Sequence, residues 1–405
     1  MSKTFFLILF LSLSLFVSMI IVTGCDNITP LPTQNSVESS EPQVTPTPEV
    51  NKEHESVLIA SEGKGALYEV EGSSVLVISG TPDEMGYQQG VLLKDKIQVM
   101  VTKVIEKTEE EMPGKLQEIW DRQKDFIPQR FKEELEGMAR GSGIPLENLQ
   151  LANIMPELFH CSGIAVFGDA THDGSMYHVR ILDYMTEYGL QDLAVVTIVR
   201  PEGYHSFISA SFAGFIGSVT GMNSSKIAIG EMGGGGEGLW DGVPMSILIR
   251  MALEETDSLD ESIGVFLNNA RTCEYYYVIS DAKVNDAVGI YATTDAFLTV
   301  DSGQDHPLLP LPLAKDTVIL SGEDRFLAIH ERIEANYGKI DETILIEMIK
   351  RPVSMKSNLH NAIFHPDSLT MWLAVAGDPA KQEDFQACYQ TYYRYNLDEW
   401  LMVSP

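Results

Sequence analysis

One stretch of the sequence combines a thiol with charged side chains at a spacing suited to nucleophilic chemistry. Cys161 opens a short apolar run, and Arg180 and Asp183 close the next one. Between the two runs, residues 169–175 form a turn cluster with an Asp-Gly pair, so the stretch predicts a β-hairpin. Because a hairpin returns its second strand beside its first, we expect Arg180 and Asp183 near the sulfur of Cys161. A cation at that position favours the thiolate.

From the residues alone, two interpretations of Cys161 stay open. It is either a nucleophile activated by charged neighbours or a small buried hydrophobic residue. Arg180 and Asp183 are also compatible with a cross-strand ion pair. Positions three apart on a regular strand face opposite sides, so these two side chains share a site only if the strand ends or bulges near Leu182.

The amino-acid sequence of this stretch resembles a known nucleophile segment. The opening Cys-Ser-Gly-Ile-Ala-Val, the Asp-Gly turn and the closing Arg-x-Leu-Asp-Tyr resemble the N-terminal-nucleophile amide hydrolases. Among these, the stretch is most similar to the acyl-coenzyme A:6-aminopenicillanate acyltransferase and choloylglycine hydrolase relatives. Upstream, EELEGMARGSGI, Asn153 and Glu157 resemble the propeptide of the acyltransferase family. The resemblance covers about residues 68–376 and is strongest at 131–184.

The resemblance implies a fold and a processing event. The fold is a four-layer αββα sandwich, in which two mostly antiparallel sheets lie face to face with helices outside, and helices alternating with strand pairs allow it. Self-cleavage between His160 and Cys161 would separate a propeptide-like segment, residues 57–160, from the catalytic portion of the same domain, residues 161–405. That smaller piece would remain a partner of the larger one.

Cleavage would also supply the catalytic base. The thiol of Cys161 would attack the substrate amide, and its freed α-amine, with a reference pKa of about 7.7 to 8.0, would carry the proton. The mechanism requires no catalytic histidine and no cofactor. Asp183 would anchor or orient the α-ammonium. Arg180 would lower the pKa of the thiol or bind a substrate carbonyl or carboxylate.

The resemblance implies further site residues, and at one position this chain differs from the family pattern. Asn223 matches a segment that contributes polar groups near the oxyanion, and Arg325 matches an arginine that faces the nucleophile. For Arg325 taken alone, a solvated helix residue is the simpler interpretation. Where the family commonly has an oxyanion-binding Asn, this chain has Asp305, and an ionised carboxylate repels an oxyanion. We therefore expect another amide, Asn223 or Asn358, to replace it, unless the register of the match differs here.

The first 56 residues predict export and tethering. Lys3 precedes an apolar stretch, and the Val-Thr-Gly-Cys sequence that ends at Cys25 resembles a bacterial lipobox. The resemblance implies a signal peptide over residues 1–25, cleaved before a lipid-modified Cys25. An uncleaved signal anchor is the alternative. Residues 26–56 are rich in Pro, Thr, Ser and Glu, which predicts a disordered tether. Either outcome places the folded part outside the cytoplasm.

Composition excludes several classes of partner. The chain has 405 residues, 44% of them hydrophobic, and a net charge of −30. An acidic surface repels nucleic acid and anionic lipid, so we expect no nucleic-acid partner and membrane contact through the lipid only. No CxxC or HExxH pattern occurs, so no metal site is expected. Cys273 and Cys388 are either a disulfide pair or two buried thiols. The four glycines from Gly233 predict a flexible loop rather than a phosphate loop.

Two functions from different classes fit the sequence. The favoured one is a lipid-anchored, self-processing cysteine amidase or acyltransferase acting on linear amide C–N bonds of N-acyl compounds. The resemblance includes bile-acid conjugates, penicillins and acylated amino acids as substrates, and the sequence does not choose among them. The alternative is a non-catalytic lipoprotein that uses the fold as a binding module, which the Asp at position 305 favours and the presence of Cys161 disfavours. An uncleaved ester hydrolase is a third, weaker interpretation.

Overall fold

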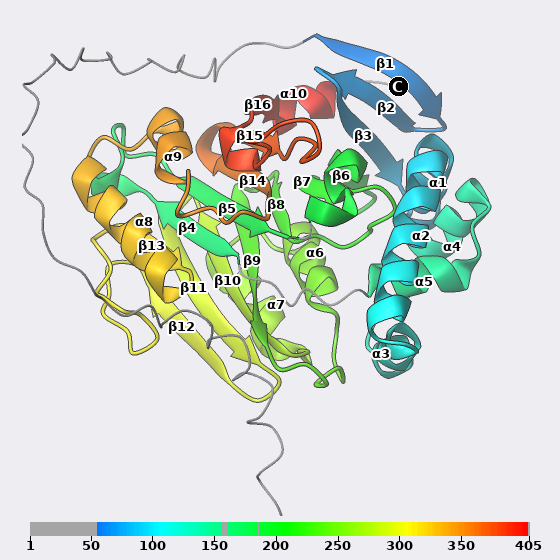
Figure 1. Ribbon diagram of the computed structural model, residues 1–405, viewed down its shortest axis with the longest axis horizontal. Helices are drawn as coiled ribbons and strands as arrows, with labels where there is room; N and C mark the ends of the chain where they lie inside the picture. The colour runs from blue at the N-terminus through cyan, green and yellow to red at the C-terminus, as the bar shows by residue number, and fades with distance from the viewer. Residues whose placement is uncertain (1–54, 155–160, 185, 404–405) are drawn as a thin grey trace, which may run out of the picture. The chain divides into compact units, whose positions relative to one another are not determined.

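Strands from both sides of the proposed cleavage point form two sheets in the computed structural model (Figure 1). The structure describes residues 55–154, 161–184 and 186–403. The signal segment, Cys25, His160 and nearly all of the tether lie outside the described residues. The described residues belong to one compact unit.

The larger sheet has ten strands, in the order β1-β2-β3-β6-β7-β8-β9-β10-β11-β12. Their bounds are β1 (Ser56–Glu62), β2 (Gly65–Val70), β3 (Ser73–Gly80), β6 (Ala194–Pro201), β7 (Phe207–Phe212), β8 (Thr220–Asn223), β9 (Ile227–Gly235), β10 (Glu274–Asp281), β11 (Asp286–Thr293) and β12 (Phe297–Asp301). Neighbours are antiparallel except β3 and β6, which are parallel. The upstream segment therefore contributes three strands to the same sheet as the downstream one.

The smaller sheet has six strands, in the order β13-β4-β5-β14-β15-β16, and all its neighbours are antiparallel. Their bounds are β4 (Ser162–Val166), β5 (Tyr177–Asp183), β13 (Thr317–Leu320), β14 (Asn358–His365), β15 (Thr370–Val375) and β16 (Tyr393–Asn396). The predicted hairpin is confirmed, because β4 pairs with β5 and Ser162 lies opposite Ile181. Cys161 thus enters the central part of the sheet beside Leu182.

Helices cover the outer faces of both sheets. On the ten-stranded sheet, α1 (Pro82–Leu92) packs on β2 and β3, whereas α6 (Met245–Glu255) and α7 (Leu259–Asn268) pack on β8 to β11. The helices α2 (Lys94–Glu111), α3 (Lys115–Gln123), α4 (Gln129–Ser142) and α5 (Leu146–Asn153) pack on α1 and on one another. On the six-stranded sheet, α8 (Glu323–Asn336) packs on β13 and α9 (Glu342–Met348) packs on α8; α10 (Leu397–Met402) follows β16.

The two sheets lie face to face in close contact. A Cβ added at Gly163 on β4 would come within 2.6 Å of Met232 Sδ on β9 and 2.8 Å of Val278 on β10. Glycine is therefore the residue that lets β4 approach the other sheet. The predicted four-layer αββα sandwich is confirmed.

Local sequence signals explain the first helical region. The Thr81 hydroxyl accepts a hydrogen bond from the Glu84 backbone N–H (3.3 Å), and the Glu84 carboxylate accepts one from the Thr81 backbone N–H (2.9 Å). This capping box starts α1 as the sequence predicts. The helical region after it divides at Leu93 into α1 and α2.

One sequence-based prediction of structure is wrong. The predicted glycine loop is part of a strand, because Gly233 to Gly235 belong to β9. Glu274 on β10 pairs with Gly235 and Tyr275 pairs with Gly233, so Gly234 is the extra residue of a β-bulge. Glycine spacing alone does not show that a neighbouring strand pairs with the glycines.

No helix within the described ranges is long and apolar enough to cross a membrane.

Candidate active site

Cys161 lies at the start of β4 and faces a cavity between the two sheets. Only 5% of the residue is exposed. The cavity, called the Cys161 cavity below, has a volume of about 250 Å³. Its other lining residues come from β9, β10, β13 and two loops: Met232, Gly233, Gly234, Glu274, Tyr276, Leu308, Leu309, Leu320, Ser321 and Gly322. The thiol therefore stands where a small substrate can meet it.

Arg180 points from β5 into the space between the sheets. It is fully buried, and its guanidinium donates to the Glu231 backbone oxygen (2.9 Å) and to the Glu231 carboxylate (3.1 Å). Glu231 on β9 is equally buried. The sequence analysis did not single out Glu231. A lone glutamate within the apolar strand Ile227–Gly235 is a usable signal, because a buried carboxylate needs a cationic partner.

Asp183 binds a different set of groups from those of Arg180. Its carboxylate lies 2.5 Å from Arg325 on α8 and accepts a hydrogen bond from the Met355 backbone N–H (2.9 Å). Of the two expected alternatives, the strand end is found, because β5 ends at Asp183. The bulge lies in the neighbouring strand: Asn358 pairs with Asp183 and His360 pairs with Leu182, which leaves Leu359 extra in β14. Two separate buried ion pairs therefore flank the cysteine.

The electrostatics of Cys161 reflect this setting. Burial raises the pKa of the Cys161 thiol to about 12, the Arg180 guanidinium opposes the shift, and the Glu231 and Asp183 carboxylates add to it. Arg180 does act in the predicted direction. Its effect is outweighed because the thiol is desolvated and Glu231 offsets the guanidinium charge. In the uncut chain, the thiol is thus protonated at neutral pH.

Arg325 acts on Asp183 and is not a solvated helix residue. Its side chain is 12% exposed, and its Nε donates to the Val353 backbone oxygen (2.6 Å) as well as pairing with Asp183. Burial raises the pKa of the Asp183 carboxyl, and Arg325 opposes this most strongly. Arg325 therefore fixes the position and charge of Asp183.

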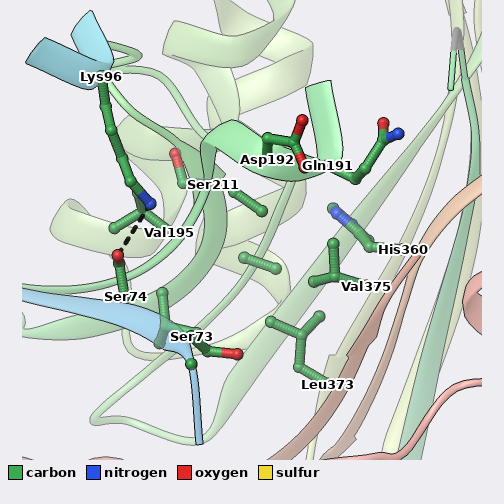
Figure 2. A pocket seen from close by; sticks show the side chains of 14 residues that line it. Ser73, Ser74, Lys96, Gln191, Asp192, Val195, Ser211, His360, Leu373 and Val375 are labelled. Carbon is green, nitrogen blue, oxygen red and sulfur yellow. Dashed lines mark hydrogen bonds between the residues drawn. The ribbon is translucent and has the colours of Figure 1, made fainter. Parts of the chain in front are cut away.

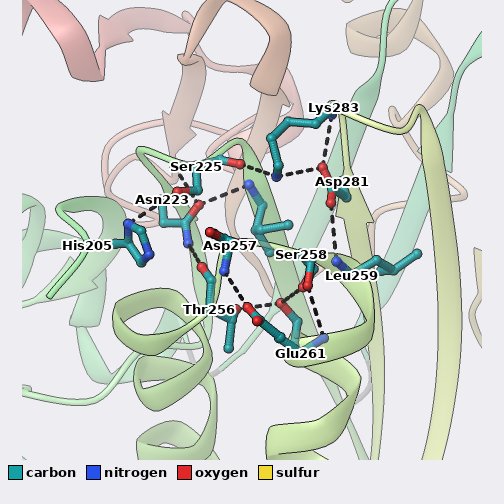
Figure 3. A network of polar contacts seen from close by, with 12 residues as sticks. His205, Asn223, Ser225, Thr256, Asp257, Ser258, Leu259, Glu261, Asp281 and Lys283 are labelled. Atoms are coloured by element: carbon teal, nitrogen blue, oxygen red, sulfur yellow. Dashed lines mark hydrogen bonds and ion pairs between the residues drawn. The ribbon is translucent and has the colours of Figure 1, made fainter.

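Asn223 requires a correction. Its amide nitrogen donates to the backbone oxygens of Leu253 (3.0 Å) and Thr256 (2.9 Å), and its oxygen accepts from Ser225 and Ile227 N–H groups (each 3.0 Å). Figure 3 shows this network at the turn between β8 and β9. Ile227 is about 17 Å along β9 from Met232, the first residue of this strand that lines the Cys161 cavity, at about 3.3 Å per residue. Asn223 therefore ties a turn to the end of α6 and does not stabilise an oxyanion at Cys161.

The other oxyanion candidates lie closer. Asp305 is exposed in the loop that continues to Leu308 and Leu309, which line the Cys161 cavity. Asn358 is buried opposite Asp183; its amide nitrogen donates to the Leu182 backbone oxygen (3.2 Å), and its hydrogen bond to Asp183 lowers the pKa of that carboxyl. Of the two amides named from the sequence, Asn358 is the one next to the site.

Cys273 and Cys388 do not line the Cys161 cavity. Cys273 and Cys388 are free and buried, which settles the open question of their pairing. Within the described ranges, no group of three or more His, Cys, Asp or Glu side chains is arranged to hold a metal ion.

Several known proteins are similar to this chain around the site. Residues 170–298 match the family model described as acyl-coenzyme A:6-aminopenicillanic acid acyl-transferase. Protein dcd1A of Dictyostelium discoideum is 26% identical over 372 residues, which cover 79% of this chain and 83% of that protein. The N-acylethanolamine-hydrolyzing acid amidase of Mus musculus is 24% identical over 186 residues, 44% of this chain and 51% of that enzyme. Over these residues, the chain is similar to N-terminal-nucleophile hydrolases.

Solved structures are similar to this chain over part of its length. One is the Caenorhabditis elegans ortholog of N-acylethanolamine-hydrolyzing acid amidase. The match covers 58% of this chain and 100% of the worm chain, with 18% identity and a TM-score of 0.42. Another is a mutant of the conjugated bile acid hydrolase of Clostridium perfringens. The match covers 58% of this chain and 97% of the bile acid hydrolase, with 12% identity and a TM-score of 0.36. The chain spans about half the length of the mouse amidase that it matches.

The geometry of the site suits acyl transfer to sulfur. The family model matches the stretch that contains Arg180 and Asp183, whereas Cys161 and Arg325 lie outside the matched residues. The structure brings Cys161, Arg180, Asp183 and Arg325 together and leaves Asn223 elsewhere. A thiol at a cavity, with one buried ion pair on each side, can attack a carbonyl if a base takes its proton.

Proposed function

We propose that this protein is an extracytoplasmic, lipid-anchored, self-processing cysteine amidase or acyltransferase that acts on linear amides of N-acyl compounds. The observation that carries the proposal is the position of Cys161, at the start of a central strand and open to a cavity between the sheets. The matched family and the mouse amidase, whose name states that it hydrolyses N-acylethanolamines, support amide chemistry.

Self-cleavage is the first reaction of the proposed mechanism. Cys161 Sγ attacks the carbonyl carbon of His160, the peptide nitrogen of Cys161 takes up a proton and leaves, and a thioester forms. Water then opens the thioester, which gives a carboxylate on His160 and frees the thiol. The N-terminal α-amine of Cys161 is then available to take the thiol proton.

Cleavage would also change the electrostatics of the thiol. In the uncut chain, burial holds the pKa of Cys161 near 12. A new α-ammonium group on the same residue places a positive charge beside the sulfur, which lowers the pKa of the thiol. Asp183, held by Arg325, offers that ammonium a carboxylate partner. The high pKa before cleavage therefore supports a nucleophile that becomes fully active only afterwards.

A small apolar cavity, with a volume of about 40 Å³, supports an aliphatic group on the acyl side of the substrate. Leu182 lies beside Cys161 and lines this cavity, so the cavity is next to the nucleophile. Its other lining residues are Met100, Ala152, Tyr184, Leu190, Phe212, Phe215 and Val219. Met100 lies on α2 and Ala152 lies on α5, so the upstream segment would still form part of the acyl site after cleavage.

The substrate proposal is tested by a panel of N-acyl compounds with graded acyl chain lengths, including N-acyl amino acids, bile-acid conjugates and penicillins. Release of the amine is measured for the wild type, Cys161→Ala and Cys273→Ala. We expect turnover that depends on chain length, is lost in Cys161→Ala and is kept in Cys273→Ala, which removes a different buried thiol. Turnover that survives Cys161→Ala would contradict the mechanism, and binding without turnover would favour the binding module.

The anchoring proposal needs a separate experiment. In a bacterial host, the protein is divided between membrane and soluble fractions, and its N-terminus is analysed by mass. We expect a diacylglyceryl-modified Cys25 in the membrane fraction, and a Cys25→Ser chain that is either released or left as uncut precursor. Unchanged membrane association of Cys25→Ser with the signal still attached would favour an uncleaved anchor.

A further inference from the structure

A third cavity, here called the edge cavity, shares no lining residue with the Cys161 cavity or the apolar cavity. It has a volume of about 280 Å³ and lies between β6 and β7 of one sheet and β14 and β15 of the other (Figure 2). Pockets for small molecules span roughly 300–1,000 Å³. The volume of the edge cavity lies just below that range, so the cavity suits a ligand of amino-acid size.

Two polar groups in the edge cavity lack a hydrogen-bond partner among the described residues. Within these ranges, the hydroxyl of Ser211 has no hydrogen-bond partner, and it is buried because only 4% of the residue is exposed. The side-chain oxygen of Gln191 is likewise buried without a partner in this part of the chain. Both side chains line the cavity. A buried polar atom without a partner costs about 1–3 kcal/mol, so these two groups indicate a bound polar molecule.

Opposite charges lie at separate positions around the edge cavity. Lys96 on α2 donates to the Ser74 hydroxyl (3.0 Å), and Asp192 is exposed on the neighbouring segment. Burial lowers the pKa of Lys96, whereas the nearby carboxylates of Asp192 and Glu69 raise it. In the described part of the chain, Lys96 and Asp192 form no direct ion pair, although both line the cavity (Figure 2). A molecule with both charges can bridge them.

The inner part of the edge cavity is uncharged. His360 is buried there, its Nε2 lies 3.3 Å from the Thr220 hydroxyl, and burial lowers its pKa well below the usual range. Leu373 and Val375 add apolar surface. A ligand should therefore place its charges toward Lys96 and Asp192 and a neutral side chain toward His360. A simple anion fits poorly, since Asp192 and Glu69 together carry more charge than Lys96.

We propose that the edge cavity is a binding site for a free α-amino acid with a small neutral side chain. The carboxylate pairs with Lys96 and the Ser74 hydroxyl, and the ammonium group pairs with Asp192. The side chain lies against Val375 and Leu373, where Ser211 offers it a hydrogen bond. This site is separate from amide hydrolysis and does not depend on it.

The test measures binding by calorimetry to the Cys161→Ala chain, so that turnover plays no part. The probes are glycine, alanine, serine and asparagine, with propionate and ethylamine as singly charged controls. We expect at least one amino acid to bind, and at least tenfold more tightly than propionate or ethylamine. Absence of binding by every amino acid, or equal binding of propionate, overturns the proposal.

Variants locate the site. Lys96→Met and Asp192→Asn should each weaken amino-acid binding at least tenfold, and Ser211→Ala should weaken binding of serine more than that of alanine. Lys94→Met, an exposed lysine on the same helix, is the matched control and should leave affinity unchanged. Melting curves check that each variant is folded; should Lys96→Met fail to fold, Asp192→Asn and Ser211→Ala decide. Unchanged affinity in these folded variants would place the binding elsewhere and overturn the proposal.

Discussion

At the scale of single residues, the site is dominated by charges that are buried in pairs. Arg180 and Glu231 are both fully buried, and Asp183 is almost so. Removing one member of such a pair leaves the other charge uncompensated, which costs more than the pair contributes. These residues therefore serve both the stability of the fold and the electrostatics of Cys161.

Arg180→Met should destabilise the protein by about 3–5 kcal/mol, because Glu231 would stay buried without its cation. The double variant with Glu231→Met should recover most of that loss. Urea unfolding in the Cys161→Ala background, where every chain is uncut, measures both. Lys381→Ala, which breaks an exposed pair with Asp378, should leave the stability close to that of the wild type. An Arg180→Met effect no larger than this control would contradict the account.

A buried histidine predicts how stability depends on pH. Burial lowers the pKa of His178 from its usual 6.5 to about 3. Between these values the unfolded chain binds a proton that the folded chain does not, so stability falls as the pH falls from about 6.5 to about 3. The limiting slope is about 1.4 kcal/mol per pH unit for one proton.

The variant that tests this pH dependence is His178→Gln. It should show a shallower acid slope in urea midpoints measured from pH 7 to pH 4, although His360, whose pKa burial also lowers, keeps part of it. The exposed His172→Gln is the control and should keep the wild-type slope. Equal slopes in the wild type and His178→Gln would rule out the proposed origin.

Residue types and spacing identified part of the site. The hairpin brings Arg180 and Asp183 to Cys161 because strand pairing is a local property of residues 162–183. Glu231 was missed because its partner lies on a distant strand. Asn223 was misplaced because its partners, Leu253 and Thr256, reach it only through the packing of α6 on the sheet. Periodicity does not carry that kind of tertiary information.

At the scale of elements, glycines set the contact between α1 and α4. Gly86 and Gly90 on α1 face Gly137 and Gly141 on α4, with each pair spaced four residues apart. A Cβ at Gly86 would lie 1.8 Å from the Glu134 backbone oxygen, and one at Gly137 would lie 2.2 Å from that of Asp83. The two helix backbones therefore touch, which only glycine permits.

Gly137→Ala should lower stability by about 1–3 kcal/mol, because a methyl group at this contact forces the helices apart. Gly264→Ala in α7 is the matched control. A Cβ there meets nothing closer than 3.5 Å, so this variant should gain up to about 1 kcal/mol from helix propensity. Thermal unfolding of both variants gives the comparison, and a neutral Gly137→Ala would contradict the described packing.

The elements were predictable where their signals are local. The capping box at Thr81 marks the start of α1, and strand composition marks β4 and β5. The glycines from Gly233 gave a wrong prediction because pairing with β10, rather than backbone preference, decides their conformation. Alternation indicated that β5 must end or bulge near Leu182, and β5 does end at Asp183. The bulge in β14 was not predicted, because it depends on pairing between strands far apart along the chain.

At the scale of the whole molecule, the segments on the two sides of residue 160 are parts of one structure. β3 pairs in parallel with β6, so the sheet itself crosses the proposed cleavage point. Arg250 on α6 is buried and pairs with Glu134 on α4 (2.7 Å) and with Glu254 (2.9 Å). The sandwich architecture itself was implied by family resemblance, because local patterns do not specify which sheet each strand joins.

The two pieces should therefore stay together after cleavage. Gel filtration in native buffer should give one peak that contains both, and denaturant should separate them. Arg250→Met leaves Glu134 and Glu254 without their shared cation, so the unfolding free energy should fall by about 3–5 kcal/mol. Arg140→Met, which breaks the exposed pair with Asp83, should cost less than about 1 kcal/mol. Separation of the wild-type pieces in native buffer would contradict this prediction.

The central claim is that Cys161 becomes an N-terminal nucleophile by self-cleavage, and the intact mass of the purified protein tests it most directly. The account predicts two polypeptides in the wild type, the smaller ending at His160 and the larger beginning at Cys161, and one uncut polypeptide in Cys161→Ala. Cys161→Ser should cleave more slowly, since a hydroxyl is a weaker nucleophile than a thiol. A wild-type protein that hydrolyses N-acyl amides as one uncut polypeptide would contradict the claim.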